Sequence, residues 1–201
     1  MGELEKILIM INRWGYLNLE QIALLLNKNI KTIQLQKEKL INLKMLNVDT
    51  LPKKNYYTLT SKAQSHLGRN HKKSIKVNYY ELQHQDMLIK WLCSQTDIEH
   101  YQTERELKME NWKLRAYPNL IVYKNDDSEI YVEFDNTKKA PIRIKNKIIN
   151  YKDWLNNGNK VHWVATNKTL SNWTQKQIIE LNLYANQHTY EIWEPNLDKK
   201  V

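Results

Sequence analysis

The sequence of 201 residues contains only one cysteine, Cys93. One cysteine excludes an intrachain disulfide and a zinc site made of several cysteines. Long apolar runs are also missing, because a stretch such as 7–11 is far shorter than the roughly 20 residues that span a bilayer. Acidic residues, Glu3 and Glu5, stand where a secretory signal peptide carries basic ones. These absences predict a cytoplasmic protein with no membrane association.

The composition that remains predicts folded domains. Hydrophobic residues make up 41% of the chain, with seven tryptophans and twelve tyrosines, which excludes a disordered polypeptide. The formal charge is +9, from 31 Lys+Arg against 22 Asp+Glu. Residues 1–76 contain 14 basic and five acidic residues, so the other 125 residues contain 17 of each. A basic first part and a neutral second part predict two domains with different partners, the first a polyanion.

The basic part has the hydrophobic spacing of three helices, then of two short strands and a fourth helix that begins near Ser61. Gly15 is expected to end the first helix, and Asn18 with Gln21 forms a capping-box pattern at the second. The expected helices cover 4–11, 18–26 and 30–44, and the expected strands cover 45–51 and 56–60. This order is typical of a winged helix-turn-helix domain, here expected over 1–68.

The third helix of such a domain enters the DNA major groove, and the hairpin contacts the DNA backbone. Lysines neutralise phosphates, whereas threonine and glutamine side chains read base edges. The residues that we expect to bind double-stranded DNA, on the outward face of this helix and at the hairpin tip, are Lys28, Lys31, Thr32, Gln34, Lys39, Lys53 and Lys54. Leu35 lies on the same predicted face, while Lys37 and Lys44 fall on the apolar side, where their stems are expected to pass along the core. The alternative is an ordinary solvated helix or a protein-binding module.

Residues 69–77 are basic and almost free of apolar side chains, which predicts a linker to a second domain over 78–201. That domain shows patterns in the order α-β-β-β-α-β-α-β, which predicts an α/β layer with a mixed sheet. The expected helices cover 79–95 and 141–157, with a third capped by Ser171, and the expected strands cover 98–102, 120–124, 129–134, 160–166 and 188–193. The whole chain is therefore expected to be an α+β protein.

Two acids of the second domain, Glu133 and Asp135, lie two residues apart on a predicted strand and point to the same face. With Pro118-Asn119 at the start of the preceding strand, the element order resembles the PD-(D/E)XK nuclease fold. The resemblance implies a Mg²⁺ site with Asn119 and Glu133 as candidate ligands, and Glu133, Asp135 and Lys147 as candidate catalytic residues. The fold usually has an acid where this chain has Asn119 and a lysine where it has Asp135.

The same acids have a second interpretation. They are also placed to form ion pairs with Lys145, Lys147 or Arg115 that hold the sheet to its helix. In that case the second domain serves assembly rather than chemistry. The third interpretation is a phosphate or metal site without catalysis. We expect no cofactor, with Mg²⁺ required only if this domain is an endonuclease directed to its target by the first domain.

The two halves together resemble the replication-relaxation family of plasmid and mobile-element proteins. The residues that carry the resemblance are Leu59-Thr60, Leu82-Gln83-His84, Pro118-Asn119, the run 131–137, and Lys147 four residues before Tyr151. The resemblance covers roughly 15–160 and implies a DNA-binding role in plasmid replication, relaxation or conjugative transfer, or in its regulation, with relaxase or replication proteins as further partners. Paired half-sites in helix-turn-helix operators further predict a homodimer.

Overall fold

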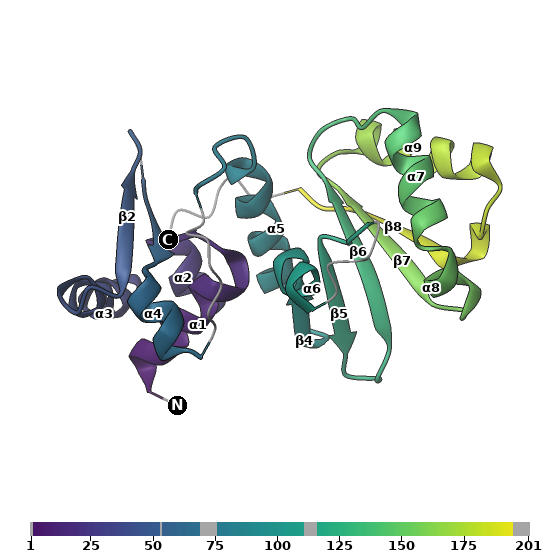
Figure 1. Cartoon of the computed structure of the whole chain (residues 1–201). Coiled ribbons are helices and arrows are strands. Elements are labelled where there is room, and N and C mark those ends of the chain that lie inside the picture. The colour runs from purple at the N-terminus through teal and green to yellow at the C-terminus, as the bar shows by residue number, and fades with distance from the viewer. Residues whose placement is uncertain (1, 53, 69–75, 111–115, 195–201) are drawn as a thin grey trace. The chain divides into compact units, whose positions relative to one another are not determined.

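The structure is a computed structural model that describes residues 2–52, 54–68, 76–110 and 116–194 (Figure 1). The described residues form an α+β protein with nine α-helices, a three-stranded sheet and a five-stranded sheet. The chain divides into two compact units, Met1–Ile89 and Lys90–Val201. This division falls inside helix α5 (Leu82–Ser94), later than the expected linker at 69–77, most of which lies outside the described residues.

The boundary is later because the segment before α5 packs on the first unit. Val77 is buried in a cluster with Tyr16 and Tyr56. The Gln85 side chain donates to the backbone oxygen of Tyr16 at 2.7 Å. The first turns of α5 thus belong to the core of the N-terminal unit.

The first unit has the predicted order of three helices, a hairpin and a short fourth helix. Its elements are α1 (Glu3–Trp14), β1 (Leu17–Asn18), α2 (Leu19–Leu25), α3 (Ile30–Asn42), β2 (Leu46–Thr50), β3 (Asn55–Leu59) and α4 (Ser61–His66). The strand order is β1-β3-β2, and β3 is antiparallel to both neighbours. Strand β1 has only two residues, too few to show an alternating pattern, and the sequence did not predict it.

Local polar groups explain where these helices begin and end. The Asn18 side chain accepts the N–H of Gln21 at 2.9 Å, and the Gln21 side chain accepts the N–H of Asn18 at 3.0 Å, which confirms the predicted capping box. The Asn29 side chain caps α3 by accepting the N–H of Lys31 at 2.9 Å. Gly15, with φ of 90°, ends α1 as predicted, because few other residues adopt this conformation.

The expected end of α3 was wrong. The helix ends at Asn42, and Lys44 follows it with a φ of 58°, so Lys44 does not lie on the apolar side of the helix. Lys37 remains in α3, where its ammonium lies 5.9 Å from the centre of the Tyr57 ring. The Lys37 stem thus passes along apolar surface while its charge lies at an aromatic face.

The second unit is built around a mixed five-stranded sheet in the order β4-β5-β6-β7-β8. Strands β4, β5 and β6 are antiparallel, whereas β6, β7 and β8 are parallel. The strands are β4 (Ile98–Thr103), β5 (Leu120–Lys124), β6 (Glu129–Asp135), β7 (Lys160–Ala165) and β8 (His188–Ile192). The helices that connect them are α6 (Glu104–Glu110), α7 (Pro141–Asn150), α8 (Lys152–Asn156) and α9 (Lys168–Leu181), with a 3-10 turn at Ala185–Gln187.

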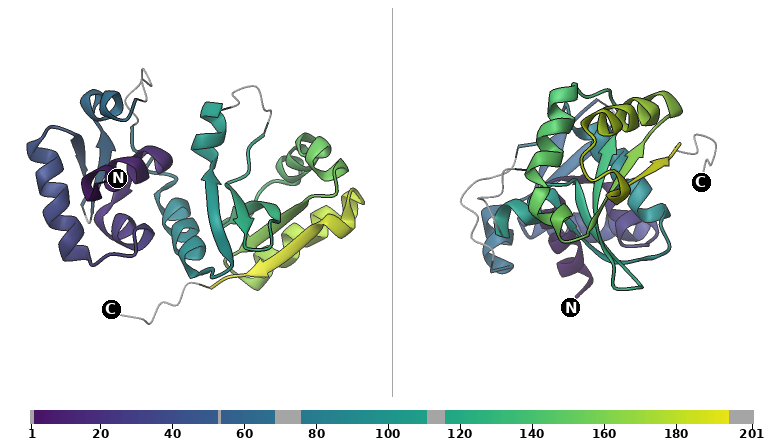
Figure 2. Two further views of the ribbon diagram at one scale, coloured as in Figure 1. Left: turned by 90° about the horizontal axis from the view of Figure 1, so that it is seen from below. Right: turned by 90° about the vertical axis from the view of Figure 1, so that its right-hand side faces the viewer.

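Helices α7, α8 and α9 cover one face of this sheet, and α7 and α9 lie side by side (Figure 2, right). The core under these helices combines Ile144 and Ile148 of α7 and Ile178 of α9 with Val161 and Trp163 of β7. Because side chains alternate along a strand, the intervening residues of β6, β7 and β8 point to the opposite face. The two faces of the sheet therefore present separate sets of side chains.

Three predictions for the second unit were wrong. The expected helix over 141–157 is interrupted at Tyr151, which separates α7 from α8. The N-cap of α9 is Asn167, whose side chain accepts the N–H of Leu170 at 2.9 Å, and Ser171 lies buried inside the helix. Helix α6 was not expected.

No helix among the described residues is both long and apolar enough to cross a membrane.

Candidate functional site

The first candidate site is the outward side of α3, which we call the α3 face and define as Lys31, Thr32, Leu35 and Lys39. All four side chains are exposed, and Gln34 is exposed beside them. The opposite side of α3 fixes the helix to the core, since Ile33 is 0% and Leu40 1% exposed. Residues three and four positions apart are neighbours on a helix, so the α3 face is one continuous strip.

The two lysines of the α3 face keep their charge uncompensated. Neither Lys31 nor Lys39 forms an ion pair within the ranges that the structure describes. Glu38, the acid next to this strip, lies 3.8 Å from the Lys37 ammonium. A helix surface with two free ammonium groups and no free carboxylate between them attracts an anionic partner.

The other lysines predicted to bind DNA are differently placed. The Lys28 ammonium lies 3.5 Å from the Glu3 carboxylate of α1, and Lys54 pairs with Glu20 of α2. Burial lowers the pKa of Lys54, but the contact with Glu20 outweighs it and leaves the pKa raised, so Lys54 is charged at neutral pH. Such exposed pairs are weak in water, so a phosphate competes readily for these lysines. Lys53 lies outside the described residues.

The second candidate site is a buried group that we call the acidic cluster and define as Glu133, Asp135, Lys139, Lys147 and Tyr151. The Lys147 ammonium and the Tyr151 hydroxyl both contact the Glu133 carboxylate, which is 0% exposed. The Lys139 ammonium contacts Asp135 and lies 3.9 Å from Glu133. Two carboxylates and two ammonium groups therefore balance in charge beneath α7.

The electrostatics of the acidic cluster favour the charged forms of Glu133 and Lys139. Burial raises the pKa of Glu133, but Lys147 and Lys139 outweigh it, and the pKa lies below its ordinary value. Burial lowers the pKa of Lys139, but Glu133 and Asp135 outweigh it, and the pKa is raised. Burial and the neighbouring Glu133 carboxylate raise the pKa of Tyr151 well above its ordinary value, so this phenol stays protonated and donates a hydrogen bond. The cluster is a set of internal ion pairs, in which each carboxylate contacts an ammonium group.

Asn119, the candidate metal ligand, is engaged with the sheet instead. Its side-chain oxygen accepts the backbone N–H of Phe134 at 2.8 Å. Mg²⁺ requires several oxygen ligands in a near-octahedral arrangement, whereas Glu133 and Asp135 are already bonded to ammonium groups. Among the described residues no three His, Cys, Asp or Glu side chains form a group that could hold a metal ion. The residues present do not fit a Mg²⁺ site, and we assign no cleavage step to them.

The structure brings together Glu133, Asp135 and Lys147, as the sequence predicted, and their contacts match the ion-pair interpretation. Lys145, the alternative partner, is exposed on α7 and contacts neither acid, and Arg115 lies outside the described residues. Sequence reasoning missed Lys139. Its only signal is the spacing of four residues from Asp135, which has no geometric meaning in the loop between β6 and α7.

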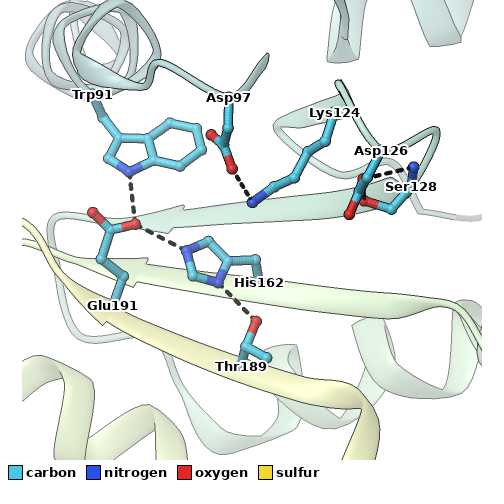
Figure 3. Close-up of polar contacts among 8 residues, drawn as sticks. All are labelled: Trp91, Asp97, Lys124, Asp126, Ser128, His162, Thr189 and Glu191. Carbon is cyan, nitrogen blue, oxygen red and sulfur yellow. Dashed lines mark hydrogen bonds and ion pairs between the residues drawn. The ribbon is translucent and has the colours of Figure 1, made fainter. Parts of the chain in front are cut away.

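A third polar group lies on the opposite face of the sheet (Figure 3). The Trp91 indole donates to the Glu191 carboxylate at 3.0 Å, and His162 lies 2.9 Å from the same carboxylate and 2.7 Å from the Thr189 hydroxyl. Since a carboxylate only accepts, His162 Nε2 donates to Glu191, and Nδ1 of a neutral ring accepts the Thr189 hydroxyl. Burial raises the pKa of Glu191, but the bonds from His162 and Trp91 outweigh it and leave the pKa lowered.

These four residues connect the part of α5 in the second unit to strands β7 and β8. His162 and Thr189 are direct neighbours across the parallel strand pair. They line a cavity of about 310 Å³ together with Lys160 and the ion pair of Asp97 with Lys124, which is 2.5 Å long. The sequence did not predict this group, because His162 and Glu191 are 29 residues apart and are brought together only by the pairing of their strands.

No family model, curated protein or solved structure matches the chain. The two candidate sites differ in exposure and in charge. The α3 face is exposed and has uncompensated positive charge. The acidic cluster is buried, paired and neutral.

Proposed function

We propose that the chain is a sequence-specific double-stranded DNA-binding protein of a plasmid or mobile element, in which α3 enters the major groove. The observation that supports this proposal best is the α3 face, where two unpaired lysines flank exposed Thr32 and Leu35. Lysines at both ends of the strip are suited to the phosphates on either side of a groove, and the side chains between them are suited to base edges. In this proposal the first unit is a winged helix-turn-helix domain.

The charge distribution favours DNA over a protein partner for this helix. Residues 1–76 carry the whole charge excess of nine, and Lys28 and Lys54 of that part hold only weak exposed pairs. Displacing counterions from phosphates is the main driving force of non-specific DNA binding, and the affinity rises with the number of lysines that contact phosphates. A protein-binding helix has no such requirement.

The second unit, in the same proposal, is a PD-(D/E)XK-like domain that serves assembly rather than cleavage. Its half of the chain has no charge excess, and the acidic cluster is neutralised from within. We propose that it dimerises the protein in the cytoplasm and contacts relaxase or replication proteins, so that the bound site serves plasmid replication, relaxation or conjugative transfer. A light-scattering mass of one chain, both free and on DNA, would rule out the dimer.

The experiment that tests the proposed function selects bound duplexes from random and native DNA with the full chain, then measures their affinity by fluorescence anisotropy. We expect one short duplex to be enriched and bound far more tightly than unrelated DNA. The variant Lys31→Ala/Thr32→Ala should lose this binding. Its matched control, Lys145→Ala/Thr169→Ala, removes the same residue types from exposed positions of the second unit and should retain it. Absence of any enriched duplex near physiological salt overturns the proposal.

A further inference from the structure

The most exposed leucine, isoleucine or valine among the described residues lies at the centre of the α3 face. Leu35 is 62% exposed, whereas Ile33 and Leu40 on the inner side of α3 are buried in the core. It lies three residues after Thr32, four after Lys31 and four before Lys39, so all three are its neighbours on the helix surface. A leucine in this position exposes apolar surface to water and adds no packing to the core of its own unit.

The neighbours of Leu35 indicate what covers it. Free ammonium groups lie one turn before and one turn after it, which matches a partner with negative charge on both sides of an apolar contact. Duplex DNA has this arrangement, because the thymine 5-methyl group is exposed in the major groove between two phosphate backbones. An apolar protein surface would leave Lys31 and Lys39 without partners.

We infer that Leu35, together with the methyl group of Thr32, packs against thymine methyl groups, so that the duplex under α3 contains thymine at the bases these residues touch. Exposed Gln34, at the edge of the α3 face, is suited to the paired strand, since a glutamine amide bonds the N6 and N7 edge of adenine. This inference rests on the proposed function and names the bases that the same helix reads.

The test uses a substitution that changes only the methyl group. In the enriched duplex, each thymine is replaced in turn by deoxyuridine, which pairs identically but lacks the 5-methyl. We expect at least one replacement to weaken binding of the wild-type chain about fourfold, which corresponds to about 0.8 kcal/mol for one methyl group removed from an apolar contact. Leu35→Ala should bind the thymine and uracil duplexes equally, both more weakly than the wild type binds thymine.

The matched control is Ile179→Ala, since Ile179 of α9 is 61% exposed and lies in the second unit. This variant should keep the fourfold preference for thymine. The inference is overturned if the wild type binds every uracil duplex as tightly as the thymine duplex, or if Leu35→Ala keeps the preference. A second copy of the chain is the alternative partner of Leu35. This alternative holds, and the inference is overturned, if the wild type shows no thymine preference and Leu35→Ala abolishes a dimer in light scattering. These outcomes differ from failure of the proposed function, in which the wild type enriches no duplex.

Discussion

The side chain of Asn119 accepts the backbone N–H of Phe134, and this bond of 2.8 Å ties the start of β5 to the position between Glu133 and Asp135 on β6. Phe134 is itself 0% exposed. The side-chain amide of Asn119 therefore has a structural role at a position where the sequence resemblance had implied a metal ligand.

Replacing Asn119 by alanine is expected to destabilise the second unit by about 1–3 kcal/mol, because it removes the acceptor of a buried N–H. The measurement is urea unfolding monitored by tryptophan fluorescence. This signal reports mainly the second unit, since six of the seven tryptophans lie after residue 89. Asn125→Ala, in the exposed turn between β5 and β6, is the control and should change stability by less than about 0.5 kcal/mol. Equal effects of the two variants would contradict the assigned role.

Removing one ammonium group from the acidic cluster should be strongly destabilising. Lys147→Ala is expected to lower the free energy of unfolding by about 3 kcal/mol. This value is at the lower end for a broken buried ion pair, because Tyr151 still donates to Glu133 and the Lys139 ammonium lies near it. The measurement is the same urea titration. Lys145→Ala is a matched control on the same helix and should cost less than about 0.5 kcal/mol, since Lys145 is exposed.

A double variant separates lost charge balance from lost packing. In Glu133→Gln/Lys147→Met both charges of the pair are removed, so part of the stability lost in Lys147→Ala should return. If the double variant is less stable than Lys147→Ala, the two residues do not act as a compensated pair.

The stability of the second unit should depend on pH through His188. Burial lowers the pKa of this residue from 6.5, and its Nδ1 accepts the indole N–H of Trp163 at 3.1 Å. The unfolded chain therefore binds a proton at a higher pH than the folded chain. Stability should be fully present above about pH 6.5 and should fall by up to about 1.4 kcal/mol per pH unit as pH drops below that value.

The variant His188→Asn tests this dependence, because the asparagine oxygen keeps an acceptor for Trp163 and does not titrate. Its urea midpoint should change less than that of the wild type between pH 7 and 5. His100→Asn, at an exposed position of β4, should follow the wild-type curve. A His188→Asn curve parallel to the wild type would show that His188 does not couple folding to protons.

Features that depend on neighbours in sequence were predicted well. The capping box at Asn18, the end of α1 at Gly15 and the shared face of Glu133 and Asp135 all follow from local spacing. The α9 cap was misplaced because Asn167 and Ser171 are both good caps four residues apart, and only the packing of Ser171 decides between them. Such a choice has no local signal.

Features that depend on distant segments could not be predicted from the sequence. Lys139 reaches Asp135 through a loop, and His162 meets Glu191 through the register of two parallel strands. The pairing of Lys54 with Glu20 likewise requires the hairpin to lie beside α2. Sequence periodicity fixes which residues share a face, whereas the partners across elements come from tertiary packing.

The most direct test of DNA binding by α3 is the salt dependence of affinity for the selected duplex, compared between the wild type and Lys31→Ala/Lys39→Ala. Each lysine that neutralises a phosphate contributes about 0.9 to the slope of log affinity against log salt, so the double variant should have a slope about 1.8 less steep. Lys145→Ala/Lys152→Ala, which removes two exposed lysines of the second unit, should keep the wild-type slope. An unchanged slope in the α3 variant, or an equal change in the control, would contradict the account.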